Sequence, residues 1–345
     1  MEYRVIGIMS GSSLDGLDLC LVRFFKDSHW QFEIEFSNTL TLPPEIKTQL
    51  NLSPTLPVLE LHSLDMEYGG WIGNELLTMF KDFPNADLIA IHGHTVFHEP
   101  KLELSIQIGN GQKIAQITGI PVIDNFRTKD ILLGGQGAPL VPFGESKLFP
   151  EFGLFLNLGG IANVSIHQQT VNAWDVAPCN QVFNYFSKKL GREYDAGGQL
   201  ARSGSLNRDW LSYLEALDFF SKEPPKSLSN QWTQKVLEHH PSDPRDSLHT
   251  YCVFLAEQIS RDLKQAQGKL MITGGGAYND FFIETLKSIS DKEIEIYLPK
   301  TKIIDFKEAL VFAFLGLMRL LGEVNILCSV TGARRDSVSG ILHQP

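Results

Sequence analysis

The chain has 345 residues, of which 43% are hydrophobic and 20% are charged, and its formal net charge is −10. That length predicts two domains, and the ordinary composition excludes a disordered chain. The acidic balance disfavours general nucleic-acid binding, which needs a basic face.

The sequence predicts a cytoplasmic protein that does not bind a membrane. Its N-terminus (MEYRVIGIMS) lacks the basic and apolar regions of a secretion signal. No apolar run approaches the ~20 residues that a membrane-spanning helix requires. The four cysteines are too far apart for a CxxC pair, so neither a zinc site nor a disulfide framework is expected. They are Cys20, Cys179, Cys252 and Cys328.

The first half of the chain opens with an expected β-hairpin. Apolar residues at 3–9 and 17–25 flank a glycine- and serine-containing turn at 10–13. A helix-like stretch at 56–80 follows, and then a buried strand at 87–93 that ends in glycine.

The second half repeats this order. A hairpin is expected at 154–166, a helix at 247–266, and a strand that runs into a glycine turn at 269–276. The chain therefore reads as an internal duplication of an α/β unit. The stretch 203–246 is rich in polar residues, aromatics and proline, and we expect a helical insertion there.

The glycine turns are candidate phosphate sites, because glycine has no Cβ to keep a phosphate away from backbone N–H groups. Asp15 and Asp18 follow the first turn and are candidate Mg²⁺ ligands, directly or through water. A plain hairpin with a solvated acidic tip is the alternative. The chain contains neither GxxxxGK[ST] nor GxGxxG after its first strand, which disfavours P-loop and dinucleotide folds. The nucleotide-site candidates are Ser10, Gly11, Ser12, Ser13, Asp15, Asp18, Asn157, Gly159, Gly160, Asn163, Gly274, Gly275, Gly276 and Asn279.

Several short motifs of the sequence, in this order, resemble those of the anhydro-N-acetylmuramic acid kinase family, within the actin, sugar kinase and heat-shock chaperone ATPase superfamily. They are GIMSGSSLDGLD (7–18), HGHTVFHEP (92–100), QIG (107–109), NFR (125–127), GGQGAPLVP (134–142), NLGGIAN (157–163), GGG (274–276), KEA (307–309) and TGA (331–333).

The resemblance implies a duplicated actin-like ATPase fold, ribonuclease H-like in each half, with two lobes around a nucleotide cleft. We assign residues 1–135 plus 325–345 to one lobe and 136–324 to the other. ATP is the implied co-substrate, with Mg²⁺. The implied reaction opens 1,6-anhydro-N-acetylmuramic acid with water and phosphorylates O6, and the resemblance also suggests a homodimer.

The resemblance further places Asp175 as the base that activates water. It places five residues near the amino sugar: Arg127, Glu308, His92, Thr95 and Gln136. The residues alone leave alternatives open. Asp175 also suits a helix N-cap before 181–190. Arg127 suits a surface ion pair with Asp124 or Asp130, and Glu308 suits a solvated or capping carboxylate at the start of a helix over 309–321.

The histidines of the 92–98 word are a weak metal signal because no cysteine or further carboxylate follows at ligand spacing, so we interpret His92, His94 and His98 as a loop beside the sugar. The chain departs from the family pattern at Ser12, Val176, Ala177, Cys179 and over Leu228–Gln231, where the family has Gly-Arg-Glu. These departures motivate one alternative, a kinase for a different amino sugar. A nucleotide-switched chaperone-like binding protein is disfavoured, because the family words run to Ala333 and leave no spare C-terminal domain.

Overall fold

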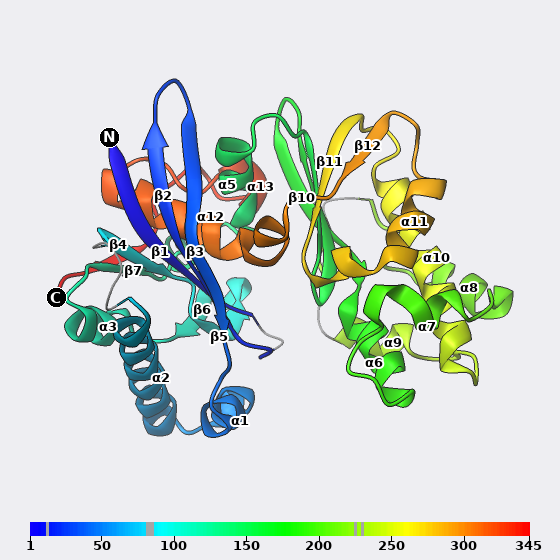
Figure 1. The fold of residues 1–345 in the computed structure, drawn as a ribbon, viewed down its shortest axis with the longest axis horizontal. Helices are drawn as coiled ribbons and strands as arrows, with labels where there is room; N and C mark the ends of the chain where they lie inside the picture. Colours follow the sequence, from blue (N-terminus) through cyan, green and yellow to red (C-terminus); the bar gives the residue numbers. More distant parts are fainter. Residues whose placement is uncertain (12–13, 81–85, 224–225, 229–230) are drawn as a thin grey trace. The chain divides into compact units, whose positions relative to one another are not determined.

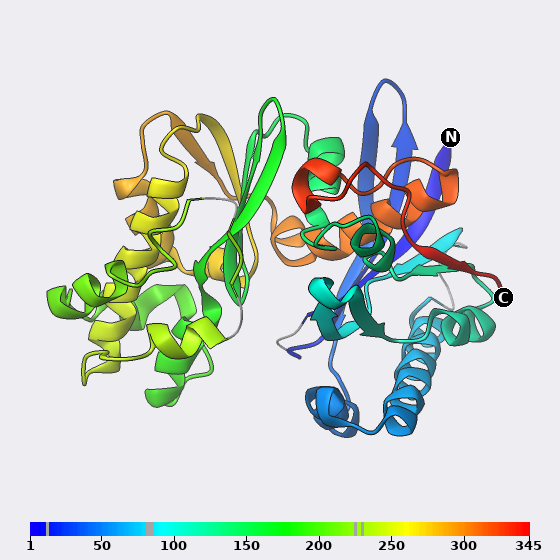
Figure 2. The same cartoon turned by 180° about the vertical axis from the view of Figure 1, so that it is seen from behind.

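A computed structural model describes residues 1–11, 14–80, 86–223, 226–228 and 231–345. The chain divides into two compact units. The first comprises Met1–Pro150 and Phe306–Pro345, and the second comprises Glu151–Asp305. Each unit has its own β-sheet and hydrophobic core. Both termini belong to the first unit, where N and C are marked in Figures 1 and 2.

The first unit is built on a six-stranded sheet in the order β13-β7-β4-β1-β2-β3. β1 is central, antiparallel to β2 and parallel to β4, and its Val5, Ile6 and Ile8 are at most 1% exposed. A strand buried on both faces needs this continuous apolar run. The strands are β1 (Glu2–Ser10), β2 (Leu17–Lys26), β3 (Trp30–Leu40), β4 (Leu88–Ile91), β7 (Val122–Asp124) and β13 (Ile341–His343).

The first unit also contains a small hairpin and several helices. The hairpin is β5 (His94–Glu99) with β6 (Leu104–Ile108). α2 and α3 lie side by side in Figure 1, and a Cβ on Gly73 of α2 would meet the Ile117 side chain at 3.1 Å. The helices are α1 (Pro44–Leu52), η1 (Ser53–Thr55), α2 (Val58–Met79), η2 (Pro100–Leu102), α3 (Gly111–Thr118), α4 (Thr128–Leu132), α5 (Val141–Leu148), α12 (Thr301–Leu321, shared with the second unit) and α13 (Cys328–Thr331).

Close backbone packing joins α12 to the first sheet. A Cβ on Gly7 of β1 would lie 2.0 Å from the carbonyl oxygen of Ala309, and one on Gly316 would lie 2.4 Å from Cβ of Ala90. Only glycine permits such approaches without displacing the backbone. This packing places α12 from Phe306 onward in the first unit.

The observed boundary therefore differs from the one expected from the sequence, which put 136–150 and 306–324 in the second half. α5 contacts α12 directly, since a Cβ on Gly144 would meet Val311 at 2.7 Å. Lys307 Nζ and Glu145 Oε1 form an ion pair at 2.5 Å, and their side chains are 2% and 4% exposed. Burial of two charges is favourable only when they are paired, so this contact fixes how the two helices meet.

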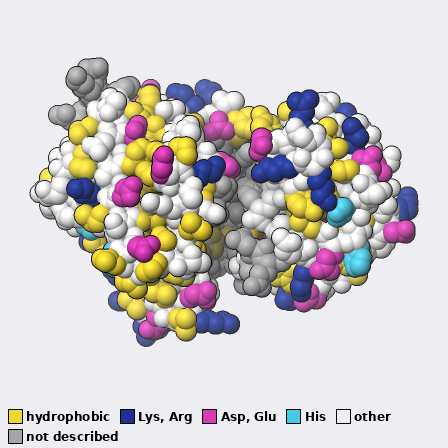
Figure 3. Space-filling model, turned by 90° about the horizontal axis from the view of Figure 1, so that it is seen from below, with side chains coloured by type: hydrophobic (Ala, Val, Ile, Leu, Met, Phe, Trp, Pro, Cys, Tyr) yellow, Lys and Arg dark blue, Asp and Glu magenta, His cyan; other side chains and the backbone are white. Residues whose placement is uncertain are grey.

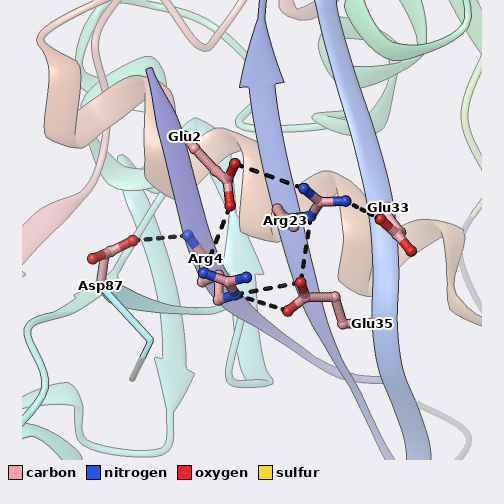
Figure 4. A network of polar contacts seen from close by, with 6 residues as sticks. All are labelled: Glu2, Arg4, Arg23, Glu33, Glu35 and Asp87. Carbon is pink, nitrogen blue, oxygen red and sulfur yellow. Dashed lines mark hydrogen bonds and ion pairs between the residues drawn. The ribbon is translucent and has the colours of Figure 1, made fainter. Parts of the chain in front are cut away.

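An exposed ion network crosses the first three strands (Figure 4). Arg4 and Arg23 are register partners on β1 and β2, where two like charges would repel each other. Glu35 lies between them, with Oε2 3.0 Å from Arg4 Nε and Oε1 3.4 Å from Arg23 Nε. Glu33 also pairs with Arg23. The network offsets that repulsion, although pairs this exposed contribute little net stability.

The second unit has a five-stranded sheet in the order β10-β9-β8-β11-β12. β8, β9 and β10 are successively antiparallel, and β11 and β12 run parallel to β8. In the first unit β3-β2-β1-β4-β7 has the same order and directions. The repeated topology confirms the duplicated, ribonuclease H-like α/β fold. The strands are β8 (Leu154–Leu158), β9 (Ile161–His167), β10 (Val171–Pro178), β11 (Gly268–Thr273) and β12 (Ile294–Tyr297).

Helices cover the second sheet, and the expected insertion at 203–246 contains two of them in its described part. Its aromatic residues pack into the unit's core: Trp210 is 1% exposed, and Phe220 contacts Phe254 of α10 with ring centroids 4.8 Å apart. The helices are α6 (Asn180–Lys189), η3 (Ala196–Gly198), α7 (Gln199–Arg202), α8 (Arg208–Glu215), α9 (Gln231–Val236), α10 (Pro244–Asp262), η4 (Gly275–Tyr278) and α11 (Asp280–Ile289).

The surface agrees with the composition. On the face drawn in Figure 3, acidic and basic side chains are interspersed. None of the described helices combines the length and apolarity needed to cross a bilayer. All four cysteines are free thiols, and three of them are buried.

Candidate active site

The first hairpin tip joins β1 to β2 beside a buried hydroxyl. Ser10 is 2% exposed and accepts a hydrogen bond from the Tyr68 hydroxyl at 3.0 Å. Gly11 is half-buried and Asp15 is exposed. Two further candidates at this tip, Ser12 and Ser13, lie outside the described residues.

Asp18 follows the tip on β2. Thr39 of β3 donates its hydroxyl to Asp18 Oδ1 at 2.6 Å. The negative charge of Asp18 also contributes to raising the pKa of Glu308, so the two carboxylates act on each other. Oxygen donors of this kind suit Mg²⁺.

No group of three or more His, Cys, Asp or Glu side chains able to hold a metal gathers among the described residues. A Mg²⁺ ion at Asp15 and Asp18 would therefore take its remaining ligands from water and phosphate, which is its usual habit.

Arg127 is held in a fixed orientation by two partners. Its Nε and Nη2 lie 3.1 and 2.8 Å from His92 Nε2, and its Nη1 donates to the Gly137 carbonyl at 2.6 Å. Because a guanidinium can only donate, His92 Nε2 accepts, and the imidazole is neutral with its proton on Nδ1. Burial and the charge of Arg127 hold the pKa of His92 well below its ordinary value. Burial lowers the pKa of Arg127 to about 10, so it stays charged at neutral pH.

These contacts leave part of the donor capacity of the guanidinium unused. Nε and Nη2 face His92 and Nη1 donates to Gly137, so one N–H of Nη1 and one of Nη2 have no hydrogen-bond partner among the described residues. A planar guanidinium with unused N–H groups suits the oxygens of a carboxylate. The surface ion pair with Asp124 or Asp130 that the sequence allowed does not form in the described part of the chain.

Asp130 instead organises the loop that contacts Arg127. It is fully buried, and its two carboxylate oxygens accept hydrogen bonds from the Gly137 amide at 2.8 Å and from the Thr331 hydroxyl at 2.7 Å. The Gln136 amide donates to the Thr331 carbonyl at 2.8 Å. The carbonyl that orients Arg127 is thus fixed by a side chain that sequence reasoning considered only as an ion-pair partner.

Glu308 lies within α12 and not at its start, so the expectation of a helix over 309–321 capped by Glu308 was wrong. The helix begins at Thr301. Its start was not recognised in the sequence because the polar residues of the first turns are exposed and interrupt the apolar pattern. Burial is the first cause that raises the pKa of Glu308. Lys307 and Arg127 lower it, whereas Asp18 and Glu145 raise it.

The β5–β6 hairpin carries the remaining sugar-site candidate, Thr95. Its hydroxyl accepts a hydrogen bond from Gln107 Nε2 at 3.4 Å. Burial lowers the pKa of His94 and of His98, and the charge of Arg127 lowers that of His98 further. These imidazoles are therefore neutral at neutral pH, which suits hydroxyl and amide recognition better than anion binding.

In the second unit, one row of register partners crosses the sheet. Asn157 on β8 pairs with Asn163 on β9, which pairs with Asp175 on β10. Directly opposed residues of antiparallel strands point to the same face. Thr273 of β11 joins the row, with its hydroxyl 3.4 Å from Asn157 Oδ1. The sheet thus brings together Asn157, Asn163 and Asp175, which were predicted from two separate sequence motifs.

A β-bulge follows Asp175, since the register shifts between Asp175 and Ala177. Bulges often redirect a side chain beside an active site. Asp175 Oδ2 accepts hydrogen bonds from the Leu228 amide at 2.9 Å and the Ser227 hydroxyl at 3.2 Å. Its Oδ1 has no partner among the described residues.

Burial raises the pKa of Asp175, and the two hydrogen bonds only partly oppose that effect. A half-buried carboxylate with one oxygen held and the other available can accept a proton. The helix N-cap that the sequence also allowed does not form, because Cys179 occupies that position before α6.

Two of the three glycines after β11, which the sequence suggested as nucleotide contacts, are required by packing against Leu158. Gly274 has φ +85°, and a Cβ there would lie 2.8 Å from the Leu158 carbonyl oxygen; one on Gly276 would meet Leu158 Cβ at 2.7 Å. Only Gly275 leaves ordinary space for a Cβ. Asn279 caps α11 by accepting the Phe282 amide at 3.0 Å.

At the second hairpin tip, the packing of the protein itself does not require glycine at positions 159 and 160. A Cβ on Gly159 or Gly160 would find its nearest neighbours at 3.4 and 3.5 Å. The carbonyl of Gly160 accepts the Cys179 amide at 2.7 Å, and that of Gly159 accepts the Asn180 amide at 3.1 Å. The tip is thereby tied to the start of α6, and the small residues leave its surface open to a ligand.

Comparison with known proteins agrees with these features. The family model described as anhydro-N-acetylmuramic acid kinase matches residues 3–345. A protein named anhydro-N-acetylmuramic acid kinase from Francisella tularensis subsp. novicida (strain U112) is 31% identical, and the alignment covers 98% of each chain.

The chain is also similar to two solved structures. One is (R)-2-hydroxyglutaryl-CoA dehydratase component A from Acidaminococcus fermentans, with TM-score 0.46, 13% identity and coverage of 92% of this chain and 99% of the other. The second is an activator of 2-hydroxyisocaproyl-CoA dehydratase from Clostridium difficile, with TM-score 0.44, 12% identity and coverage of 91% and 94%. The full-length family match and the curated relative show that this chain belongs to the anhydro-N-acetylmuramic acid kinase family.

Proposed function

We propose that this protein opens 1,6-anhydro-N-acetylmuramic acid with water and transfers the γ-phosphoryl group of ATP to O6, giving N-acetylmuramic acid 6-phosphate and ADP. The observation that carries the assignment of roles is Asp175: a half-buried carboxylate of raised pKa, with Oδ2 held and Oδ1 available, in a row of polar side chains.

In this mechanism Oδ1 of Asp175 accepts a proton from water as the water oxygen bonds to the anomeric carbon. The bond between that carbon and O6 breaks, and O6 forms a bond to the γ-phosphorus while the phosphorus–oxygen bond to ADP breaks. A base poised near neutral pH suits this step, because it must be ionised and yet still take a proton. The raised pKa of Asp175 moves it in that direction.

Arg127 is the proposed partner of the substrate's lactyl carboxylate. It retains unused N–H groups on Nη1 and Nη2, and its contacts with His92 and Gly137 hold the guanidinium in one orientation. Pre-orientation lowers the entropy lost on binding. Glu308, Thr95 and Gln136 are proposed to complete the sugar site with polar contacts.

The nucleotide is proposed to contact the two hairpin tips and the turn at Gly274–Gly276. Gly11, Gly159 and Gly160 let backbone N–H groups approach phosphate. Asp15 and Asp18 would hold Mg²⁺, which would neutralise phosphate charge when bound. A cytoplasmic location and a homodimer also belong to the proposal, and light scattering of the purified protein tests the dimer.

One experiment tests the reaction as a whole. The protein is incubated with the anhydro sugar, ATP and Mg²⁺ in isotopically labelled water, and the product is analysed by mass spectrometry. We expect one label at the anomeric oxygen and a phosphate on O6. Phosphorylation of N-acetylglucosamine, without turnover of the anhydro sugar, would instead support a kinase for a different amino sugar.

A further inference from the structure

A short segment, residues 226–228, lies along β10 beside Asp175. The Asp175 amide donates to the Lys226 carbonyl at 3.0 Å. In return, the Leu228 amide and the Ser227 hydroxyl donate to Asp175 Oδ2. This edge segment therefore fixes both the backbone and one carboxylate oxygen of the proposed base. Because residues 226–228 do not belong to a strand of the sheet, side-chain contacts are needed to keep this segment in place.

The side chain of Lys226 anchors the edge segment to the core of the unit. Its Nζ lies 3.4 Å from Asp262 Oδ1 and 5.3 Å from the centre of the Phe219 ring. The side chains of Lys226 and Asp262 are only 4% and 6% exposed. A lysine whose charge is this deeply buried needs its partner, so the position of the segment depends on Asp262.

Asp262, at the end of α10, also binds the residue that precedes Asp175 on β10. Its second oxygen, Oδ2, accepts a hydrogen bond from Trp174 Nε1 at 2.8 Å. Trp174 directly precedes Asp175 on β10, and Lys226 directly precedes Ser227. One buried carboxylate thus joins the strand that carries the proposed base to the segment that binds it.

We propose that Lys226 and Asp262 are positioning residues, which hold the edge segment against Asp175 so that Oδ2 stays hydrogen-bonded and Oδ1 stays available to water. This inference rests on the proposed function of Asp175. Neither residue contacts a reacting atom. Their effect passes through Trp174, Ser227 and Leu228.

The acid limb of the kcat profile against pH reports on this arrangement, because Asp175 must be ionised to act. Hydrogen bonds from Leu228 and Ser227 lower its pKa, and among the described residues no charged side chain contributes to the shift. Loss of the edge segment removes these hydrogen bonds, which raises the pKa of Asp175, and it exposes the carboxylate to water, which lowers that pKa, so the acid limb should leave its wild-type position.

Asp262→Asn tests this role directly. Release of the edge segment would remove two hydrogen bonds from Asp175 and change its burial, so we expect the acid limb to move from its wild-type position. We also expect kcat to fall by about 10- to 100-fold with little change in the KM for ATP.

Lys226→Met should reproduce these effects, and Lys226→Arg should restore much of the activity because it keeps a buried cation. Lys264→Met is the matched control, since Lys264 is exposed just beyond the same helix. Leu286→Ala, in the core of the same unit, controls for stability: it should lower Tm without moving the acid limb.

An acid limb and a kcat that stay at wild-type values in both Asp262→Asn and Lys226→Met would overturn the positioning role. Asp175→Asn is measured alongside. If it loses turnover while Asp262→Asn does not, only this inference fails. If Asp175→Asn keeps its turnover, the proposed base fails and the inference fails with it.

Discussion

Replacement of Arg127 should change which substrates the enzyme distinguishes. Its guanidinium has one unused N–H on Nη1 and one on Nη2, while the contacts with His92 and Gly137 hold the planar group in place. A hydrogen bond between charged groups contributes about 1.5–3 kcal/mol. Lysine keeps the charge but presents a point rather than a fork, so Arg127→Lys should lose roughly one such bond.

The expected loss for Arg127→Lys is about 10- to 150-fold in kcat/KM, since 1.4 kcal/mol corresponds to about tenfold. The assay compares 1,6-anhydro-N-acetylmuramic acid with the same sugar in which the lactyl carboxylate is a carboxamide. The wild type should prefer the acid, and the variant should prefer it much less. Arg334→Lys, which changes an exposed arginine of the same unit, serves as the control.

The comparison of the two substrates isolates the carboxylate contact. Arg127→Lys also disturbs His92 and Gly137, but that disturbance affects both substrates alike. The coupling between residue and carboxylate therefore appears only as a difference of ratios. An equal loss of kcat/KM on acid and amide would refute the assignment of Arg127 to the carboxylate, whatever the size of the loss.

Substitutions at three further places test other parts of the structure. Asp175→Asn should lower kcat by about 10²–10⁴-fold while ATP affinity in calorimetry stays near wild type, and unchanged turnover would remove its role. The folded state raises the pKa of Asp175, so the wild type loses stability as pH rises through that pKa; the variant should therefore show a higher Tm at neutral pH but not in acid. Glu145→Gln should reduce the unfolding free energy by about 3–5 kcal/mol, and Glu145→Leu combined with Lys307→Met should recover most of it in urea titrations; equal losses would contradict a buried pair. Gly274→Ala should cost about 1–3 kcal/mol of stability and weaken nucleotide binding, and a neutral effect on Tm would argue against the left-handed turn.

The sequence predicted the elements with strong periodicity and missed those with weak signals. Both hairpins, the strands at 88–91 and 268–273 and the helices α2 and α10 lie close to their expected positions. β3, β5, β6, β12 and the three-residue strands β7 and β13 were missed. β3 alternates poorly because it is only partly buried, and strands of three residues carry no period.

The unit boundary was hard to predict for a related reason. From Ala309 to Met318 nearly every residue of α12 is buried, whichever way it points. A helix that is apolar on all sides is predicted to be buried, but its sequence does not indicate which sheet it packs against. The small residues Gly7 and Gly316 carry that information, and their meaning becomes clear only when the partner backbone is known.

The candidate site was found through motifs, but its internal contacts were not. Arg127 and His92 are 35 positions apart, and Asp175 is 53 positions from Leu228. Several of the partners are backbone groups, which have no sequence signature. Asp130 and Asp262 were missed as organisers because a buried aspartate has no pattern that separates it from an exposed one.

The duplicated topology shows how one scaffold supports two kinds of carboxylate. In each unit the row next to the hairpin tip crosses three strands: Met9, Asp18 and Thr39 in the first, Asn157, Asn163 and Asp175 in the second. The acid stands on the middle strand in one row and on the outer strand in the other.

This difference in position gives each acid a different environment. Thr39 on the neighbouring strand donates its hydroxyl to Asp18 Oδ1, a carboxylate that we propose as a cation ligand. Asp175 stands where β10 bulges, and burial raises its pKa in spite of the hydrogen bonds from the edge segment, which suits the proton acceptor proposed above. The repeated fold supplies equivalent positions, and we propose that the strand bearing the carboxylate separates the cation ligand from the proton acceptor.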